Sequence, residues 1–302
     1  MKHAVVSIGT NSTRLLVVEE SDGALEPVLQ RSTGTRLGEN LREEGHLASE
    51  AVTRTLAVVD EYMGIIRAQK ADASAIATSA MRRATDAKKF AREVEARVGA
   101  PLEIVQGERE AELSYRGATA KHRGDDRVGV LDAGGGSVEF ACGRRGVIEN
   151  RVSCEIGAVR LSEAIPELLG AKVPADPLGL EGNARKYAAD HLRPLGMMPR
   201  VKMTYAVGGT AFNAAMIVED SDRETLDCTL LTGENLTELA RRFLALDTAA
   251  RRAQPRISAQ RADIFPAGLL IIDTALQILR LQQCTLSRLD LLYGYLLEKY
   301  PR

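Results

Sequence analysis

Apolar residues near the start of the chain fall into two short runs separated by a polar joint. The runs "AVVSI" (4–8) and "RLLVV" (14–18) are rich in β-branched residues and leucine, which is typical of strands. The joint "GTNS" (9–12) is rich in residues that build tight turns. The pattern predicts a β-hairpin whose turn carries free backbone N–H groups, and such a turn can hold an anion.

The hydrophobic period then changes to that of a helix. Apolar residues that recur every three or four positions predict a helix with one buried face: Val52, Leu56, Val59, Met63 and Ile66. Ser49 fits the N-cap position of this helix. Strand-then-helix patterns follow over 73–100 and 101–120, so we expect an α/β fold in which helices cover a sheet.

The middle of the chain contains a charged, glycine-containing linker, "KHRGDD" (121–126), which predicts a domain boundary. We expect one lobe over 1–125 and a second over 126–302, with the last helix able to pack back on the first lobe. The second lobe opens with "VGVLDAGGGSVEFACG" (128–143), again two apolar runs around a small-residue turn. This weak internal repeat predicts two related lobes with a cleft between them. It aligns Asp132 with Ser7, Gly134 with Gly9, Ser137 with Ser12, and Phe140 with Leu15.

The second lobe continues with helical patterns near 159–169 and 180–195. A strand at about 203–207 then runs into Gly208, Gly209 and Thr210 and a further helix. Helices are also expected over about 234–246 and 263–281 and near the C-terminus.

Composition narrows the class of protein. The 302 residues include 40 basic and 41 acidic side chains, a formal net charge of −1, which argues against nucleic acid as a partner. The four cysteines lack metal-site spacing, so we expect reduced, buried thiols. The N-terminus lacks a signal-peptide pattern, and the longest apolar run (265–279) is too short to span a bilayer and contains Asp273. We therefore expect a cytoplasmic protein without a membrane partner.

Candidate chemistry gathers at three glycine-rich turns that each follow a strand: "GTNS" (9–12), "GGGS" (134–137) and "GGT" (208–210). Glycine lets the backbone approach a phosphate closely, and N–H groups and hydroxyls supply donors. A single turn of this kind is usually a plain hairpin. Three turns, two of them related by a repeat, favour a phosphate-binding cleft.

Carboxylates accompany these turns. Asp132 and Glu139 flank the second turn and could hold Mg²⁺ against phosphate oxygens, or could be a turn-starting Asp and a solvated Glu. Glu108, Glu110 and Glu112 lie in the first turns of a predicted helix, where Glu112 could simply pair with Arg116.

Arginines near the turns suit a polyanionic ligand because a guanidinium matches phosphate oxygens: Arg14, Arg36, Arg82 and Arg83. The histidines His3, His46, His122 and His191 are scattered, and we assign them no role.

An ordered series of segments over essentially the whole chain resembles the exopolyphosphatase and guanosine pentaphosphate phosphohydrolase (Ppx/GppA) family. The segments are "SIGTNSTRLLV", "ATSAMRRATD", "IVQGEREAELSYRG", "VLDAGGGSVEF", "GAVRL", "AVGGTAFN" and "RADIFPAGLLII". The resemblance implies two ribonuclease-H-like lobes of the actin and sugar-kinase superfamily around a central phosphate-binding cleft. The chain is similar to the short form of the family, without a C-terminal helical domain.

The resemblance also implies roles for individual residues. Glu110 corresponds to the catalytic base that orients or deprotonates the attacking water, and Asp132 and Glu139 to ligands of Mg²⁺ or Mn²⁺. The phosphate-binding positions would be Gly9, Thr10, Asn11, Ser12, Arg82, Gly134, Gly135, Gly136, Ser137, Gly208 and Gly209. The implied substrates are inorganic polyphosphate and guanosine penta- or tetraphosphate, and the family often forms homodimers.

The chain departs from the family pattern at several positions. Ser7 stands where the family has Asp before the first turn, and Arg109 replaces the first of two glutamates. Leu292 and Tyr293 stand where the family tends to have Arg-Glu. Two functions therefore remain open: a phosphohydrolase that releases terminal phosphate, and a catalytically weakened sensor that binds polyphosphate or guanosine tetra- or pentaphosphate. A kinase of the same superfamily fits the two lobes but not the placement of Glu110.

Overall fold

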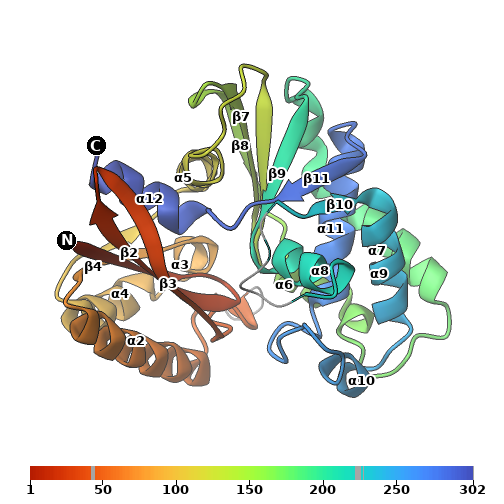
Figure 1. Ribbon diagram of the computed structural model, residues 1–302. Coiled ribbons are helices and arrows are strands. Elements are labelled where there is room, and N and C mark those ends of the chain that lie inside the picture. Colours follow the sequence, from red (N-terminus) through yellow and green to blue (C-terminus); the bar gives the residue numbers. More distant parts are fainter. Residues whose placement is uncertain (42–44, 222–225, 227, 302) are drawn as a thin grey trace.

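The computed structural model describes residues 1–41, 45–221, 226 and 228–301. The elements form two lobes, each built on its own sheet (Figure 1). Among the described residues, no helix combines the length and the apolar character needed to cross a membrane.

The first lobe contains a five-stranded sheet in the order β3-β2-β1-β4-β5. Its strands are β1 (Lys2–Ile8), β2 (Ser12–Ser21), β3 (Ala24–Gly34), β4 (Asp72–Ala77) and β5 (Leu102–Ile104). β2 pairs antiparallel with β1 and β3, whereas β4 pairs parallel with β1 and β5. The predicted opening hairpin is therefore confirmed.

The second lobe contains a six-stranded sheet in the order β10-β11-β9-β6-β7-β8. Its strands are β6 (Val128–Ala133), β7 (Val138–Arg144), β8 (Val147–Cys154), β9 (Met203–Val207), β10 (Leu230–Thr232) and β11 (Gln283–Leu286). The arrangement β8-β7-β6-β9-β11 repeats the strand order and directions of the first sheet. The internal repeat thus extends beyond the two aligned turns to the whole first sheet and to every strand of the second sheet except β10.

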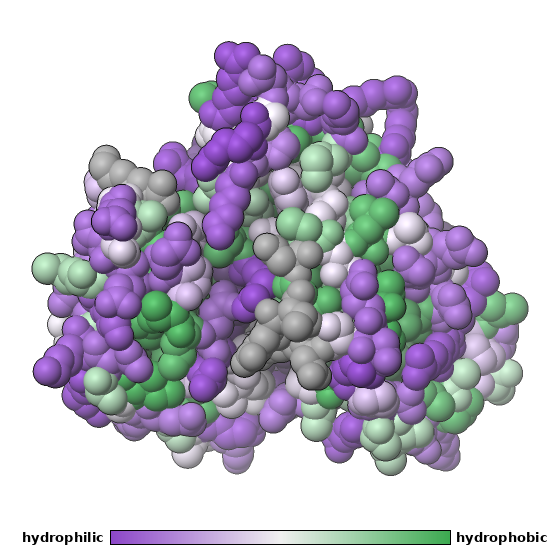
Figure 2. All heavy atoms as spheres, viewed as in Figure 1, coloured by the Kyte–Doolittle hydropathy of each residue, from purple (hydrophilic) through white to green (hydrophobic). Residues whose placement is uncertain are grey.

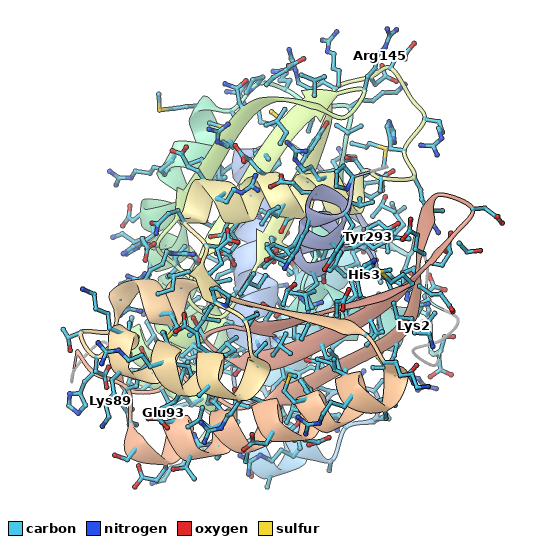
Figure 3. All side chains as sticks on the ribbon, turned by 90° about the vertical axis from the view of Figure 1, so that its left-hand side faces the viewer. Lys2, His3, Lys89, Glu93, Arg145 and Tyr293 are labelled. Atoms are coloured by element: carbon cyan, nitrogen blue, oxygen red, sulfur yellow. The ribbon has the colours of Figure 1, made fainter. Side chains whose placement is uncertain are left out.

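Helices cover both faces of the first sheet, as the alternation of side chains along β1 requires. Ala4, Val6 and Ile8 join the apolar core under α2 (Ser49–Gln69) and α4 (Ala87–Val98), while Val5 points to the other face. There it joins the last helix, α12 (Leu291–Lys299). In Figure 3, Tyr293 of α12 lies above the sheet, opposite the α4 residues Lys89 and Glu93.

The second sheet is also covered on both faces. The large core on one face includes residues of α6 (Ala158–Ala164), α7 (Pro177–Leu192), α8 (Gly209–Val218), α9 (Gly233–Leu244) and α11 (Phe265–Ile278). Shorter helical segments are η1 (Pro166–Leu169), η2 (Arg193–Met197) and α10 (Thr248–Arg252). The other face packs on α5 (Gly107–Ala118), through Ala111, Tyr115 and Ala118.

Helix α5 lies between the two sheets. It precedes the predicted boundary at 125 but packs against β6, β7 and β8 of the second sheet and against α12. Because Glu110 lies in its first turn, this position brings the candidate base to the junction of the lobes. In the space-filling view, hydrophilic residues are visible in the hollow between the lobes (Figure 2).

Candidate active site

The first loop (9–12) and the second loop (134–137) have the same hydrogen-bonded geometry. The Gly9 N–H donates to Ser12 O over 3.0 Å, and the Gly134 N–H donates to Ser137 O over 3.0 Å. The strand registers also correspond, because Ser7 pairs with Arg14 as Asp132 pairs with Glu139. The predicted alignment of the two turns is confirmed, and it reveals that Arg14 occupies the place of Glu139.

The two loops approach each other directly across the junction of the lobes. A Cβ atom on Gly136 would lie 2.4 Å from Oγ1 of Thr10 and 2.6 Å from Oγ of Ser79, and one on Gly135 would lie 3.1 Å from Cβ of Asn11. The second loop therefore needs glycine at these positions. The hydroxyls of Thr10 and Ser79 are buried and have no hydrogen-bond partner among the described residues. A phosphoryl group could use them as donors, since buried polar atoms rarely stay unpaired.

The candidate base contacts a residue that was predicted to bind phosphate. Arg82, in α3 (Ser79–Arg83), donates from Nη1 to Oε2 of Glu110 over 2.6 Å and to Val105 O over 2.9 Å. Its Nη2 donates to Oγ of Ser137 over 3.2 Å and lies 3.8 Å from Oε1 of Glu139. Arg82 thus links Glu110 of α5 to the second loop. The N–H groups of Arg82 donate to oxygens of Glu110, Val105 and Ser137.

Burial raises the pKa values of the three predicted acidic site residues. It raises the pKa of Glu110 to about 7, although Arg82 opposes the shift. Burial likewise raises the pKa of Asp132 to about 6, while a hydrogen bond of 2.7 Å from Ser114 opposes it. The pKa of Glu139 is raised well above its ordinary value by burial and by the charges of Glu110 and Asp132. These carboxylates repel one another, so a bound cation would stabilise their ionised forms.

The residues present fit a magnesium ion held partly by substrate. Among the described residues, no group of three or more acidic, histidine or cysteine side chains is arranged as a metal site. Mg²⁺ commonly takes one or two carboxylates together with waters and substrate phosphates. Asp132 and Glu139, directly opposite each other on β6 and β7, offer two carboxylates of this kind.

The third loop (208–210) lies against Asp132. Gly208 has a φ of 96°, and a Cβ atom there would lie 3.3 Å from Oδ1 of Asp132. Gly209 begins α8, and the hydroxyl of Thr210 is buried without a partner in the part of the chain that the structure describes. The three glycine loops therefore lie around one site, next to Asp132.

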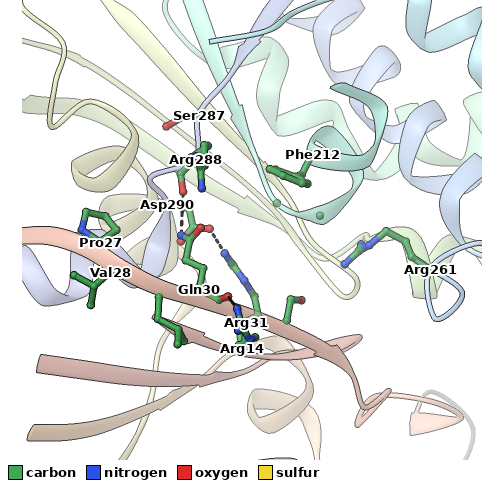
Figure 4. Close-up of a pocket in the computed structure, with 14 residues that line it drawn as sticks. Arg14, Pro27, Val28, Gln30, Arg31, Phe212, Arg261, Ser287, Arg288 and Asp290 are labelled. Carbon is green, nitrogen blue, oxygen red and sulfur yellow. Dashed lines mark hydrogen bonds and ion pairs between the residues drawn. The ribbon is translucent and has the colours of Figure 1, made fainter. Parts of the chain in front are cut away.

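Two neighbouring cavities extend from the third loop along the junction of the lobes. The larger, of about 450 Å³, lies between β2, β3, the third loop and the segment before α12 (Figure 4). Four arginines line it: Arg14, Arg31, Arg261 and Arg288. The second cavity, of about 260 Å³, shares Ser32, Gly209, Phe212 and Arg261 with the first. A cleft with this charge suits a chain of phosphates.

Several residues at the site were not found by sequence reasoning. Ser114 and Ser153 donate to Asp132 and Glu139, and Asp290 pairs with Arg14. Nη2 of Arg36 donates to both carboxylate oxygens of Asp263, at 2.7 and 2.6 Å, and to Gln260 O at 3.0 Å, so Arg36 joins the two lobes. No local signal marks these partners, because each lies in another element.

The proposed pairing of Glu112 with Arg116 is wrong. Glu112 instead contacts Arg109 at 2.8 Å and Arg151 at 2.9 Å. Arg116 lies 3.7 Å from Glu298 of α12, because α12 packs along α5 and supplies a second acid.

Comparison with known proteins identifies the family of this chain. The model of the Ppx/GppA phosphatase family matches residues 16–302. The chain belongs to this family. The match begins after the first loop, so it does not include Ser7.

Relatives of this family cover almost the full chain. Exopolyphosphatase 2 of Mycobacterium tuberculosis is 29% identical, over 98% of this chain and 97% of the relative. The crystal structure of the Aquifex aeolicus Ppx/GppA family member is 26% identical, with a TM-score of 0.80 over 99% of this chain and 97% of that one. An exopolyphosphatase from Cytophaga hutchinsonii, 24% identical, has the same fold, with a TM-score of 0.88 over 99% of this chain and 98% of that one. The two-lobed fold of the family, expected from sequence, is thereby established.

Proposed function

We propose that this protein is a phosphohydrolase that releases the terminal phosphate of inorganic polyphosphate. The observation that carries the proposal is the position of Glu110, buried where the first and second loops meet, with a pKa of about 7. A base with this pKa can accept a proton near neutral pH. The arginine-lined cleft provides room for further phosphates of the same chain.

The roles of the side chains follow from their positions. Thr10, Ser79 and the N–H groups of the second loop would donate to oxygens of the terminal phosphoryl group. Arg82 would exchange Ser137 for a phosphoryl oxygen while it keeps Glu110 in place. Glu110 would orient a water molecule and accept its proton.

A divalent cation would be held by Asp132 and Glu139, with Mg²⁺ preferred and Mn²⁺ an alternative. Such an ion, when bound, neutralises charge on the phosphate oxygens. Ser114 and Ser153 keep the two carboxylates oriented through hydrogen bonds of 2.7 and 2.8 Å.

The test is phosphate release from long-chain polyphosphate with Mg²⁺. Glu110→Gln keeps the shape of the side chain but removes the base, and we expect kcat to fall by about 10²- to 10⁴-fold. Glu108→Gln is a matched control on the same helix, because Glu108 is 67% exposed and contacts Arg151. Equal rates for wild type and Glu110→Gln would contradict the proposal. Guanosine pentaphosphate is the second substrate to test, with release of the 5′ γ-phosphate as the readout.

One observation favours a second function, a sensor that binds polyphosphate or guanosine tetra- or pentaphosphate without turning it over. Ser7 supplies no carboxylate at the place where the second lobe has Asp132. Calorimetry that detects micromolar binding of either ligand, combined with no phosphate release, would favour this function over hydrolysis.

A further inference from the structure

The first lobe lacks a carboxylate on its own strands where the second lobe has two. In the second lobe, Asp132 and Glu139 are direct partners across β6 and β7. The equivalent partners across β1 and β2 are Ser7 and Arg14. Arg14 therefore has no acidic cross-strand partner, although its side chain is only 30% exposed.

A carboxylate reaches Arg14 from the other end of the chain. Asp290, which precedes α12, accepts a hydrogen bond from Nη2 of Arg14 through Oδ2. Figure 4 shows the two side chains pointing toward each other inside the larger cavity, close to the third loop. Of the described residues that line this cavity, Asp290 is the one acid among four arginines.

The backbone of Asp290 is held rigidly. A Cβ atom on Gly117 of α5 would lie 2.0 Å from the Asp290 carbonyl oxygen, so α5 packs directly on this residue. Oδ1 of Asp290 also accepts from the Leu292 N–H over 3.0 Å, which makes Asp290 the N-cap of α12. The side chain is thus fixed at both of its oxygens.

The ion pair of Arg14 and Asp290 lies close to Asp132 of the second lobe. Gly208 lines the same cavity as Arg14 and Asp290, and a Cβ atom on it would lie 3.3 Å from Oδ1 of Asp132. Burial lowers the pKa of Arg14, but the charges of Asp290 and Asp132 outweigh it, and the pKa is raised. If Asp290 were lost, Asp132 would be the remaining acid whose charge is known to act on Arg14, and a pairing there would compete with the cation for this carboxylate.

We infer that Asp290 is a positioning residue that replaces the missing carboxylate at Ser7: it holds Arg14 away from Asp132 so that the remaining N–H donors of Arg14 bind phosphoryl oxygens of the substrate. This inference rests on the proposed function. A guanidinium fixed by one carboxylate loses less side-chain freedom when it binds a second anion.

The central variant is Asp290→Asn, because Asn is as good an N-cap as Asp and removes only the charge. We expect the affinity for tripolyphosphate with Mg²⁺, measured by calorimetry in a Glu110→Gln background, to fall about tenfold, the order of one charge-assisted contact. In the active protein, KM for polyphosphate should rise more than kcat falls. Asp125→Asn is the matched control, since Asp125, in the segment before β6, pairs with Arg145 in the turn between β7 and β8, and these side chains are 74% and 72% exposed.

A second substitution that restores the affinity of Asp290→Asn would show that Asp290 positions Arg14 and does not only stabilise the fold. Ser7→Asp places a carboxylate directly opposite Arg14 in the strand register, so Ser7→Asp/Asp290→Asn should regain most of the lost affinity. A purely structural defect at the N-cap would not be repaired from β1. Melting temperatures close to that of the wild type would show that α12 still packs on α5 and β1 in each variant.

The outcomes distinguish this inference from the proposed function. Tripolyphosphate binding that depends on Asp290, without any hydrolysis by the active protein, would support the inference and contradict the hydrolase. Hydrolysis with unchanged or tighter binding in Asp290→Asn would overturn the inference and leave the hydrolase in place. Failure of the double variant to recover affinity would also overturn it.

Discussion

Arg82 and Glu110 form an ion pair at the junction of the lobes, with Nη1 2.6 Å from Oε2, and both side chains are 9% exposed. The pair joins the proposed base to the proposed phosphate-binding arginine. Its members come from α3 and α5, and α5 packs on the second sheet while its Leu113 joins the core on the first sheet, so the pair lies where the two lobes meet.

The first prediction concerns the acid limb of activity. Because Glu110 has a pKa of about 7 and must be ionised to act as base, we expect kcat/KM to fall as the pH drops below about 7. Arg82→Ala removes the charge that lowers this pKa, so the limb should move to higher pH. We also expect kcat/KM at its optimum to fall by about 10²-fold, since a donor to the phosphoryl group is lost. Arg97→Ala, which breaks an exposed pair with Asp60, is the control.

The second prediction concerns stability. The pKa of Glu110 is raised from 4.5 to about 7 on folding, so the native state binds the proton more tightly. The free energy of unfolding therefore falls as the pH rises through this range. Glu110→Gln removes the cost of the buried charge, and we expect the variant to unfold at a higher temperature than wild type at pH 8 but not at pH 4. A scan that gives the same difference at both pH values would contradict this explanation.

The third prediction tests the contact between the loops. Gly136→Ala would place a methyl group 2.4 Å from Oγ1 of Thr10, so the loops would separate and substrate affinity should fall. We expect KM for polyphosphate to rise by about tenfold or more, as small displacements of binding groups cost this much. Gly182→Ala on α7 is a matched control, because no atom lies within 4 Å of the added methyl group. It should be neutral or stabilise the helix by about 0.5–1 kcal/mol.

The fourth prediction concerns the ion pair of Arg36 and Asp263, which joins the lobes. Arg36 donates to both oxygens of Asp263, whose side chain is 8% exposed. Arg36→Ala leaves this carboxylate buried with only the Ile264 N–H as a described donor, so we expect a loss of about 1–3 kcal/mol in unfolding experiments. Arg145→Ala, at an exposed pair, should change stability by less than about 1 kcal/mol. Equal losses of unfolding free energy in Arg36→Ala and Arg145→Ala would show that the buried pair between the lobes stabilises the protein no more than an exposed pair does.

Local patterns in the sequence are sufficient for much of the fold. The alternation in 4–8 and 14–18 predicts the hairpin, and the period of Leu56, Val59 and Met63 predicts α2. The alignment of Asp132 with Ser7 predicts the two related sheets. These features depend on neighbours a few positions apart, and backbone geometry then determines which residues share a face.

The sequence by itself determined the three glycine loops, the acids Glu110, Asp132 and Glu139, and the absence of a carboxylate at Ser7. Only the tertiary structure decided what these groups contact. Arg82 meets Glu110 across 28 positions, Arg36 meets Asp263 across 227, and Arg14 meets Asp290 across 276. Charged side chains do not recur at a regular spacing along the chain, so the sequence pattern does not predict their partners. The packing of the two sheets and α5 determines which charged groups meet. The raised pKa values arise in the same way, because burial at the junction of the lobes exists only once both lobes are folded and in contact.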